Sequence, residues 1–237
     1  MTWRVQISGE KVDLEALSIS FKDDDRRLVV EDDKYFLESL NFESTSDSAE
    51  VLKMAIDLAA VLSGVARLAY GARIPLMVGH IERVRPDGVK DVFVQLTGPP
   101  AMRALLGNLK VDAPGASEAE TETADQPHRW IRVADEDEAV SKALRLFGSD
   151  AKDWVGLYRL FEVIQQDVGE IAAEWATAKS IERFRRTANS PTASGDLARH
   201  GKERTQPPKN SMDLFEARAL IEVILHCWMR AKDIGSR

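Results

Sequence analysis

Arg199 and His200 stand side by side in a polar, glycine-containing stretch that runs from Glu182 to Glu203. An imidazole can take up or release a proton near neutral pH, and a guanidinium can hold the charge of a phosphate. Arg199 and His200 are therefore the candidate catalytic residues of this chain. A surface histidine bonded to Asp196 would also explain His200, and the residues alone favour that simpler interpretation.

The same region reverses the charge of the chain. Residues 179 to 209 contain eight Lys or Arg and three acids, so the local charge is 8 − 3 = +5, against a net charge of -7 for the whole chain. Arg183 and Arg186 lie one helical turn apart and share a face. With Asn189 and Lys202 they are candidate binding residues for phosphate groups or for an acidic protein surface. Cations are also common at helix C-termini because of the helix dipole, which is the simpler explanation.

The residue inventory argues against several other kinds of site. No spacing of Cys and His fits zinc, and no glycine-rich loop fits a nucleotide, so we expect neither a metal nor another cofactor. His226 and Cys227 are neighbours on a predicted helix and point about 100° apart, so they do not form a nucleophile pair. Because Cys227 is the single cysteine, no intramolecular disulfide can form, and a reducing compartment is expected.

Hydropathy and charge point to a cytoplasmic protein. The first residues have the pattern of a strand and lack an apolar leader. No apolar run approaches the roughly 18 residues that would suggest a membrane span, so no membrane partner is expected. The net charge of -7 predicts no protein-wide attraction to nucleic acid, which leaves RNA as a partner of the basic region alone.

The first half of the chain predicts an α+β fold, a small antiparallel sheet with helices packed on one face. Strands are expected at residues 3–7, 27–31, 34–42, 76–85 and 89–96, and helices at 12–21 and 47–70. Residues 102–111 are a weak candidate for a helix or a strand. Residues 112–128 contain five acids and no Lys or Arg, which predicts an acidic linker; a long surface loop within one domain fits equally well.

The second half predicts four amphipathic helices, at about residues 135–147, 153–168, 171–188 and 213–228. Their connections suggest an up-and-down four-helix bundle. The third connection is the exception, at about 24 residues, and connections of that length are usually functional or disordered. The expected division is an α+β domain at 1–111, the linker at 112–128 and the helical bundle at 129–237, with two separate cores.

Three segments carry a resemblance to a known family: the helix from Leu157 to Gly169, the block RFRRTANSPTASGDLARHG and the run MDLFEARALIEVILHCW. From about Asp135 onward the chain resembles the HEPN-like helical bundles of bacterial toxins and phage-defence proteins. The whole chain is similar to a bacterial protein family that joins an α+β half to this helical half. The resemblance implies a HEPN-like four-helix bundle. It also implies metal-free RNA cleavage in which His acts on the 2′-hydroxyl and Arg stabilises charge on the phosphate.

Two functions from different classes remain. The first is an interaction module of a bacterial defence or stress system, which binds a protein partner or itself through the helical half. The alternative is a metal-free HEPN-type endoribonuclease that uses Arg199 and His200. HEPN ribonucleases separate their Arg and His by four to six residues, whereas Arg199 and His200 are adjacent. The pair with the family spacing, Arg73 and His80, falls in the α+β half, so the interaction module is favoured.

Overall fold

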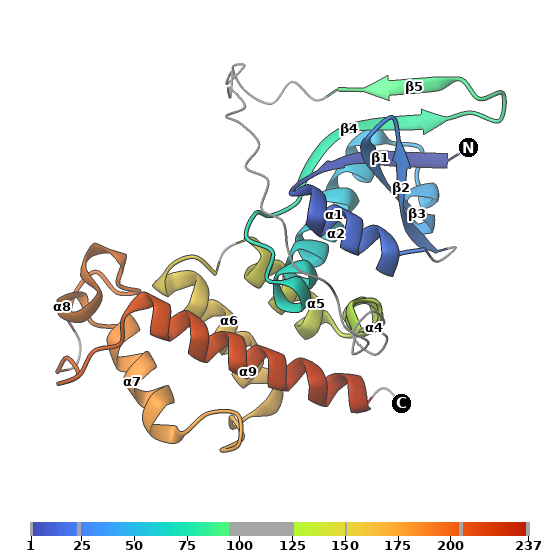
Figure 1. Cartoon of the computed structure of the whole chain (residues 1–237). Coiled ribbons are helices and arrows are strands. Elements are labelled where there is room, and N and C mark those ends of the chain that lie inside the picture. The colour runs from blue at the N-terminus through green and yellow to red at the C-terminus, as the bar shows by residue number, and fades with distance from the viewer. Residues whose placement is uncertain (1, 23–24, 95–125, 150, 204–205, 236–237) are drawn as a thin grey trace.

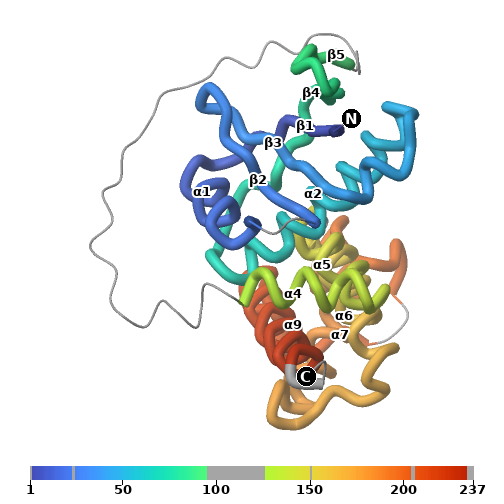
Figure 2. The backbone as a smooth tube through the Cα atoms, turned by 90° about the vertical axis from the view of Figure 1, so that its right-hand side faces the viewer, coloured from blue at the N-terminus to red at the C-terminus, as the bar shows by residue number. Residues whose placement is uncertain are grey.

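The computed structural model describes residues 2–22, 25–94, 126–149, 151–203 and 206–235, and it has an α+β fold (Figure 1). Figure 2 shows the sheet with α1 and α2 at one end of the molecule and α4 to α9 at the other. The N-terminal elements, in chain order, are β1 (Thr2–Ser8), α1 (Lys11–Ser20), β2 (Arg26–Glu31), β3 (Lys34–Ser39), the 3-10 helix η1 (Leu40–Ser44), α2 (Ser48–Tyr70), β4 (Met77–Val84) and β5 (Lys90–Phe93).

The five strands form one antiparallel sheet in the order β2-β3-β1-β4-β5, which confirms the predicted antiparallel sheet. Local sequence explains its two hairpins. Asp32 and Asp33 both have positive φ in the tight turn between β2 and β3, as a right-twisted hairpin requires. Gly88 supplies the positive φ that follows Pro86 and Asp87 in the turn before β5.

Helix α2 links the sheet to the rest of the molecule. Asp47 caps its first turn by accepting a hydrogen bond from the Ala49 amide at 2.9 Å. Gly71 ends the helix in the left-handed conformation, with φ of 71°. Glycine adopts this conformation readily because it has no Cβ. Its buried residues run along the whole helix, so α2 packs on β1 and β4 with one part and on α4 and α5 with another.

The helical part has more elements than predicted. They are α4 (Gln126–Glu136), α5 (Glu138–Ser149), α6 (Trp154–Val168), α7 (Ala178–Ala188), α8 (Pro191–Ser194), the 3-10 helix η2 (Gly195–Leu197) and α9 (Leu214–Gly235). The helix expected from residue 135 begins at Glu138 instead. The carboxylate of Asp137 accepts from the amides of Ala139 and Val140 and so separates α4 from α5.

Other predicted boundaries also shift. Helix α4 begins at Gln126, so the last residues assigned to the acidic linker are helical, and the rest of that linker lies outside the described residues. The helix expected from residue 171 begins at Ala178, because Thr177 caps it there by accepting from the Ser180 amide. Residues 102–111 also lie outside the described residues. Within the described ranges, no helix has the length and apolar character needed to cross a membrane.

The two halves share one continuous hydrophobic cluster, whereas two separate cores were expected. The cluster runs from the sheet through α2 and α5 to α9, and α2 packs closely on α5. A Cβ atom at Gly64 of α2 would overlap the carbonyl oxygen of Leu144, and one at Gly148 of α5 would lie 2.5 Å from that of Ala60. The two helix backbones therefore touch, and only glycine fits at their crossing.

We predict that Gly64→Ala lowers the free energy of unfolding. Alanine favours a helix interior by up to about 1 kcal/mol over glycine, but the added methyl cannot be placed without separating α2 from α5. Such overpacking typically costs about 1–3 kcal/mol, so we expect a net loss measurable by chemical denaturation. Gly201→Ala is the matched control, because a Cβ there meets no atom within 4 Å. Equal stability of Gly64→Ala and the wild type would show that the helices do not cross this closely.

Candidate functional site

Helix α7 carries the predicted binding residues Arg183 and Arg186, and both bind the chain that leads into α9. Arg183 Nε donates to the carbonyl of Asn210 at 2.9 Å, and its Nη2 donates to the carbonyl of Ser211 at 2.8 Å. Both terminal nitrogens of Arg183 also donate to the carboxylate of Glu216, at 3.2 and 2.8 Å. Arg186 Nη2 donates to the carbonyl of Gln206 at 2.6 Å.

A buried hydroxyl completes the attachment of this segment to α7. Thr187 has no exposed surface, and its Oγ1 accepts a hydrogen bond from the Met212 amide at 3.1 Å while donating to the Arg183 carbonyl. Glu216 also accepts from the Asp213 amide, and Asp213 accepts from the Glu216 amide, so the two residues form a capping box at the start of α9. The Asp213 amide and the Arg183 guanidinium together lower the pKa of Glu216. The segment is thus bonded to α7 and to the start of α9.

Arg199 and Asn189 converge on the ring of Tyr158 in α6. The Arg199 guanidinium carbon lies 4.1 Å from the centre of that ring, and Arg199 Nη2 donates to Glu162 Oε1 at 2.8 Å. The Arg199 amide also donates to the carbonyl of Ala188 at 2.8 Å. Asn189 Nδ2 donates to Tyr158 Oη at 3.4 Å. One candidate catalytic residue and one candidate binding residue therefore meet at a single aromatic ring.

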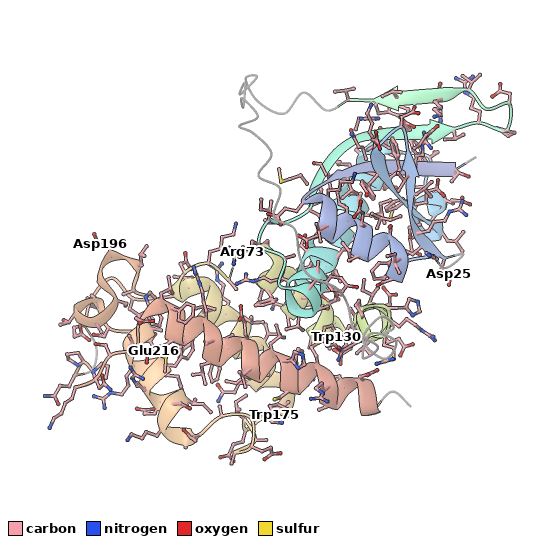
Figure 3. The ribbon with its side chains drawn as sticks, in the orientation of Figure 1. Asp25, Arg73, Trp130, Trp175, Asp196 and Glu216 are labelled. Atoms are coloured by element: carbon pink, nitrogen blue, oxygen red, sulfur yellow. The ribbon has the colours of Figure 1, made fainter. Side chains whose placement is uncertain are left out.

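His200 and Lys202 are placed differently. His200 is half-buried, and within the described ranges its side chain has no hydrogen-bond partner, so the bond to Asp196 that was considered for it is not formed. Lys202 is exposed. Figure 3 shows Asp196 at the far end of the helical part and Glu216 at the start of α9, beside α7. The six predicted residues thus fall into an Arg199–Asn189 group at Tyr158, an Arg183–Arg186 group bonded to residues 206–216, and two side chains outside both.

The carboxylates around this stretch reduce its positive charge. Adding Glu162 and Glu216 to the count for residues 179 to 209 gives +5 − 2 = +3. Glu203 binds the first turn of α8, where it accepts from Ser190 Oγ at 3.0 Å and from the Thr192 amide at 3.1 Å. Desolvation opposes ionisation of Glu203, but these hydrogen bonds outweigh it and lower its pKa. Part of the positive charge expected here is therefore paired inside the protein, and a net charge of +3 remains.

The partners of these cations were not found from the sequence. Tyr158 and Glu162 lie one turn apart on the helix predicted at residues 153–168. That spacing signals a shared face, but it does not indicate that Arg199, 37 positions further along, would cover that face.

A second polar cluster, also absent from the predictions, lies on the sheet face opposite α2. Arg4 Nε donates to Glu82 Oε2 at 2.6 Å, and Arg4 also forms an ion pair with Glu31. Glu82 receives a further hydrogen-bond contact from His80 Nε2 at 3.0 Å. Lys90 Nζ donates to Glu31 at 2.7 Å. Since Glu31 belongs to β2 and Lys90 to β5, the sheet curls far enough for side chains of its two edge strands to meet.

Among the described residues, no group of three or more His, Cys, Asp or Glu side chains is placed to hold a metal ion. A groove of about 710 Å³ is lined mainly by apolar residues of α2 and of the segment that leads into and begins β4. None of the six predicted site residues lines that groove. Comparison of the chain with protein-family models, curated proteins and solved structures gives no match.

We predict that Arg183→Met loosens the segment between residues 206 and 213. The change removes charged hydrogen bonds to two carbonyls and to Glu216, for an expected loss of about 1–2 kcal/mol. Limited trypsin digestion should then cut faster after Lys209, and the Met212 amide should exchange faster. Arg185→Met is the matched control, because Arg185 is exposed and its side chain has no partner among the described residues. Equal digestion of both variants would contradict the role given to Arg183.

Proposed function

We propose that this chain is a non-enzymatic interaction module that binds another protein through its helical part. Its setting in a bacterial defence or stress system is part of the proposal and is supported by the resemblance of the helical half to HEPN-like bundles. The observation that carries the proposal is the internal use of the candidate catalytic cation. Arg199 is stacked on Tyr158 and paired with Glu162, so its side chain attaches the stretch that contains it to α6.

The best candidate for the binding surface is the outer face of α9. Phe215 is 80% exposed and Val223 is 51% exposed, and Ala219 is exposed between them. These three residues are spaced by four, so they form one apolar stripe on the helix. Figure 1 shows α9 running along the helical part, and the exposure of these residues leaves the stripe open to a partner. An exposed aromatic residue of this kind is typical of the anchors that carry most of the energy of a protein–protein interface.

The charged neighbours of the stripe make it more suitable for a protein than for a nucleic acid. Glu216 is paired with Arg183, and Glu222 with Arg67, so two side chains of α9 that flank the stripe are already neutralised. Binding at the stripe would therefore bury apolar surface without stranding unpaired charge. Complete burial of a phenylalanine side chain is worth about 2–3 kcal/mol, which is enough to decide an interface of modest size.

The first test uses affinity purification from cells that produce the protein naturally, followed by reconstitution with the purified partner. Phe215→Glu should abolish recovery of the partner and weaken the reconstituted complex at least tenfold. Val12→Glu is the matched control, because Val12 is also the second residue of a helix and is 75% exposed. Equal binding by wild type, Phe215→Glu and Val12→Glu would refute the assignment of α9 as the binding surface.

The alternative function, metal-free RNA cleavage, is supported by the convergence of Arg199 and Asn189 beside the half-buried His200. A phosphate would have to displace Glu162 from Arg199 before it could bind there. We expect purified wild-type protein and His200→Ala both to leave mixed RNA intact. Cleavage by the wild type alone would establish the nuclease and overturn the proposal, because the imidazole would then supply proton transfer. Equal cleavage by both proteins would indicate a contaminating nuclease.

A further inference from the structure

The two edges of the sheet differ in whether another segment of the described chain bonds to them. The outer edge of β2 is partly occupied, since Lys22 forms a β-bridge with Arg27 and the Leu28 amide donates to the carbonyl of Phe21 at 3.3 Å. Strand β5 is the last strand of the sheet, and within the described ranges no strand pairs with its outer edge. Figure 1 shows β5 as the outermost strand at the sheet end of the molecule. An open edge of this kind is a template for a further strand.

The hydrogen-bond pattern shows which backbone groups of β5 are not bonded to β4. The Arg85 amide donates to the carbonyl of Val89, which begins the β4–β5 ladder. In an antiparallel ladder, alternate residues bond to the neighbouring strand. Val89, Asp91 and Phe93 therefore face β4 with their backbone groups, and those of Lys90 and Val92 point outward.

Charged residues normally protect an exposed edge, but those of β5 are already engaged. Lys90 donates to Glu31 across the curled face of the sheet. The Asp91 carboxylate accepts from Arg83 at 3.0 Å and is also paired with Arg85, and these two guanidinium groups lower the pKa of Asp91. The apolar Val92 is 54% exposed. Among the described residues, the edge thus presents backbone groups without a strand partner and an apolar side chain, with its own charges neutralised.

We propose that β5 pairs with β5 of a second copy of this chain. The two strands run antiparallel, and a twofold axis passes between the two copies of Val92. This pairing extends the two sheets into one continuous sheet. Val92 lies opposite Val92 of the second copy, and Lys90 lies opposite residue 94. Because all of these positions have outward-facing backbone groups, the pairing forms about six hydrogen bonds between the copies.

The register follows from the symmetry of the pairing and from the charges along β5. A twofold axis perpendicular to the sheet keeps the same face of both sheets on one side. In an antiparallel pair, residues opposite each other point to the same face, so one residue at the axis must lie opposite its own copy. Shifting the axis by one residue towards Lys90 would put Asp91 opposite Asp91, and like charges directly opposite one another are destabilising. Shifting it the other way would centre the pairing on Phe93, whose backbone groups face β4. Either shift would also reduce the number of outward-facing pairs. Val92 is therefore the favoured centre.

This interface is independent of the partner surface on α9, because β5 belongs to the sheet. It is also small, since β5 spans Lys90–Phe93, so we expect a weak dimer that forms as the protein concentration rises. Sedimentation equilibrium at increasing concentration should show the mass rising from that of one chain, 26.4 kDa, towards that of two.

Two substitutions at Val92 test the edge directly. The Val92 amide faces outward and makes no hydrogen bond to β4, so Val92→Pro removes only the donor that a second copy would use. This variant should therefore stay at the mass of one chain and keep its fold. Val92→Lys should do the same by placing an unpaired charge at the axis. Val30→Pro is the matched control: Val30 is 53% exposed on the other edge strand, and this variant should associate like the wild type. Circular dichroism checks the fold of each variant. If the proline variant misfolds, the result with Val92→Lys decides the test.

A cross-link tests the register. In a Cys227→Ser background, Val92→Cys should oxidise to a disulfide-linked dimer, because paired residues lie about 5.5 Å apart between Cα atoms, within the range of a disulfide. Val89→Cys should not cross-link, since the two copies of residue 89 lie far apart in this register. Phe215→Glu should leave the dimer intact, which separates this test from that of the α9 surface.

Several results would overturn the proposal. One is a wild type that stays at the mass of one chain up to several hundred micromolar. Another is association that survives both Val92 variants, and a third is association lost in Phe215→Glu, which would assign it to α9. Slow exchange of the Val92 amide in a strictly monomeric protein would show instead that another part of the same chain covers the edge.

Discussion

The contact between α2 and α5 holds the molecule together. Gly64 and Gly148 let the two helix backbones touch, and through this crossing the sheet and the helical part share one hydrophobic cluster. Arg67 of α2 strengthens the same junction by donating to the carbonyl of Phe147 at 2.9 Å and stacking over its ring. Because α2 also packs on β1 and β4, a change at the crossing is felt on both sides of the junction. The sheet and the helical part therefore meet across a packed hydrophobic boundary.

The sequence identified elements whose signals lie within one segment. Asp47 and Gly71 mark the ends of α2, and Asp32 and Asp33 form the turn between β2 and β3, because caps and turns depend on neighbouring residues. The candidate site was less predictable, because its geometry depends on distant partners. Arg199 meets Glu162 across 37 positions, and no local pattern encodes that meeting.

The two glycines at the crossing show the same limit from the packing side. The helix predicted to stop at about residue 147 continues through Gly148, which lies within α5 and allows close approach to Gly64. A helical glycine can reflect a terminus or a packing requirement, and the choice depends on which element lies across from it. Likewise, the acids that surround the basic stretch could be counted from the sequence, but their assignment as ion-pair partners required the fold. A count of charge therefore overstated how much cationic surface is available to a ligand.

The proposed interfaces lie at opposite ends of the molecule, and this arrangement has a consequence for binding. Strand β5 forms the outer margin of the sheet end, and Phe215 lies at the start of α9 in the helical part (Figure 1). Two chains joined at β5 would present two Phe215 surfaces at a fixed separation. A partner with a single binding site would gain little from this, whereas a paired or repetitive partner would bind both surfaces, the second as an intramolecular step. Weak pairing at a short edge strand can therefore still govern function, because it would select for partners that are themselves assembled.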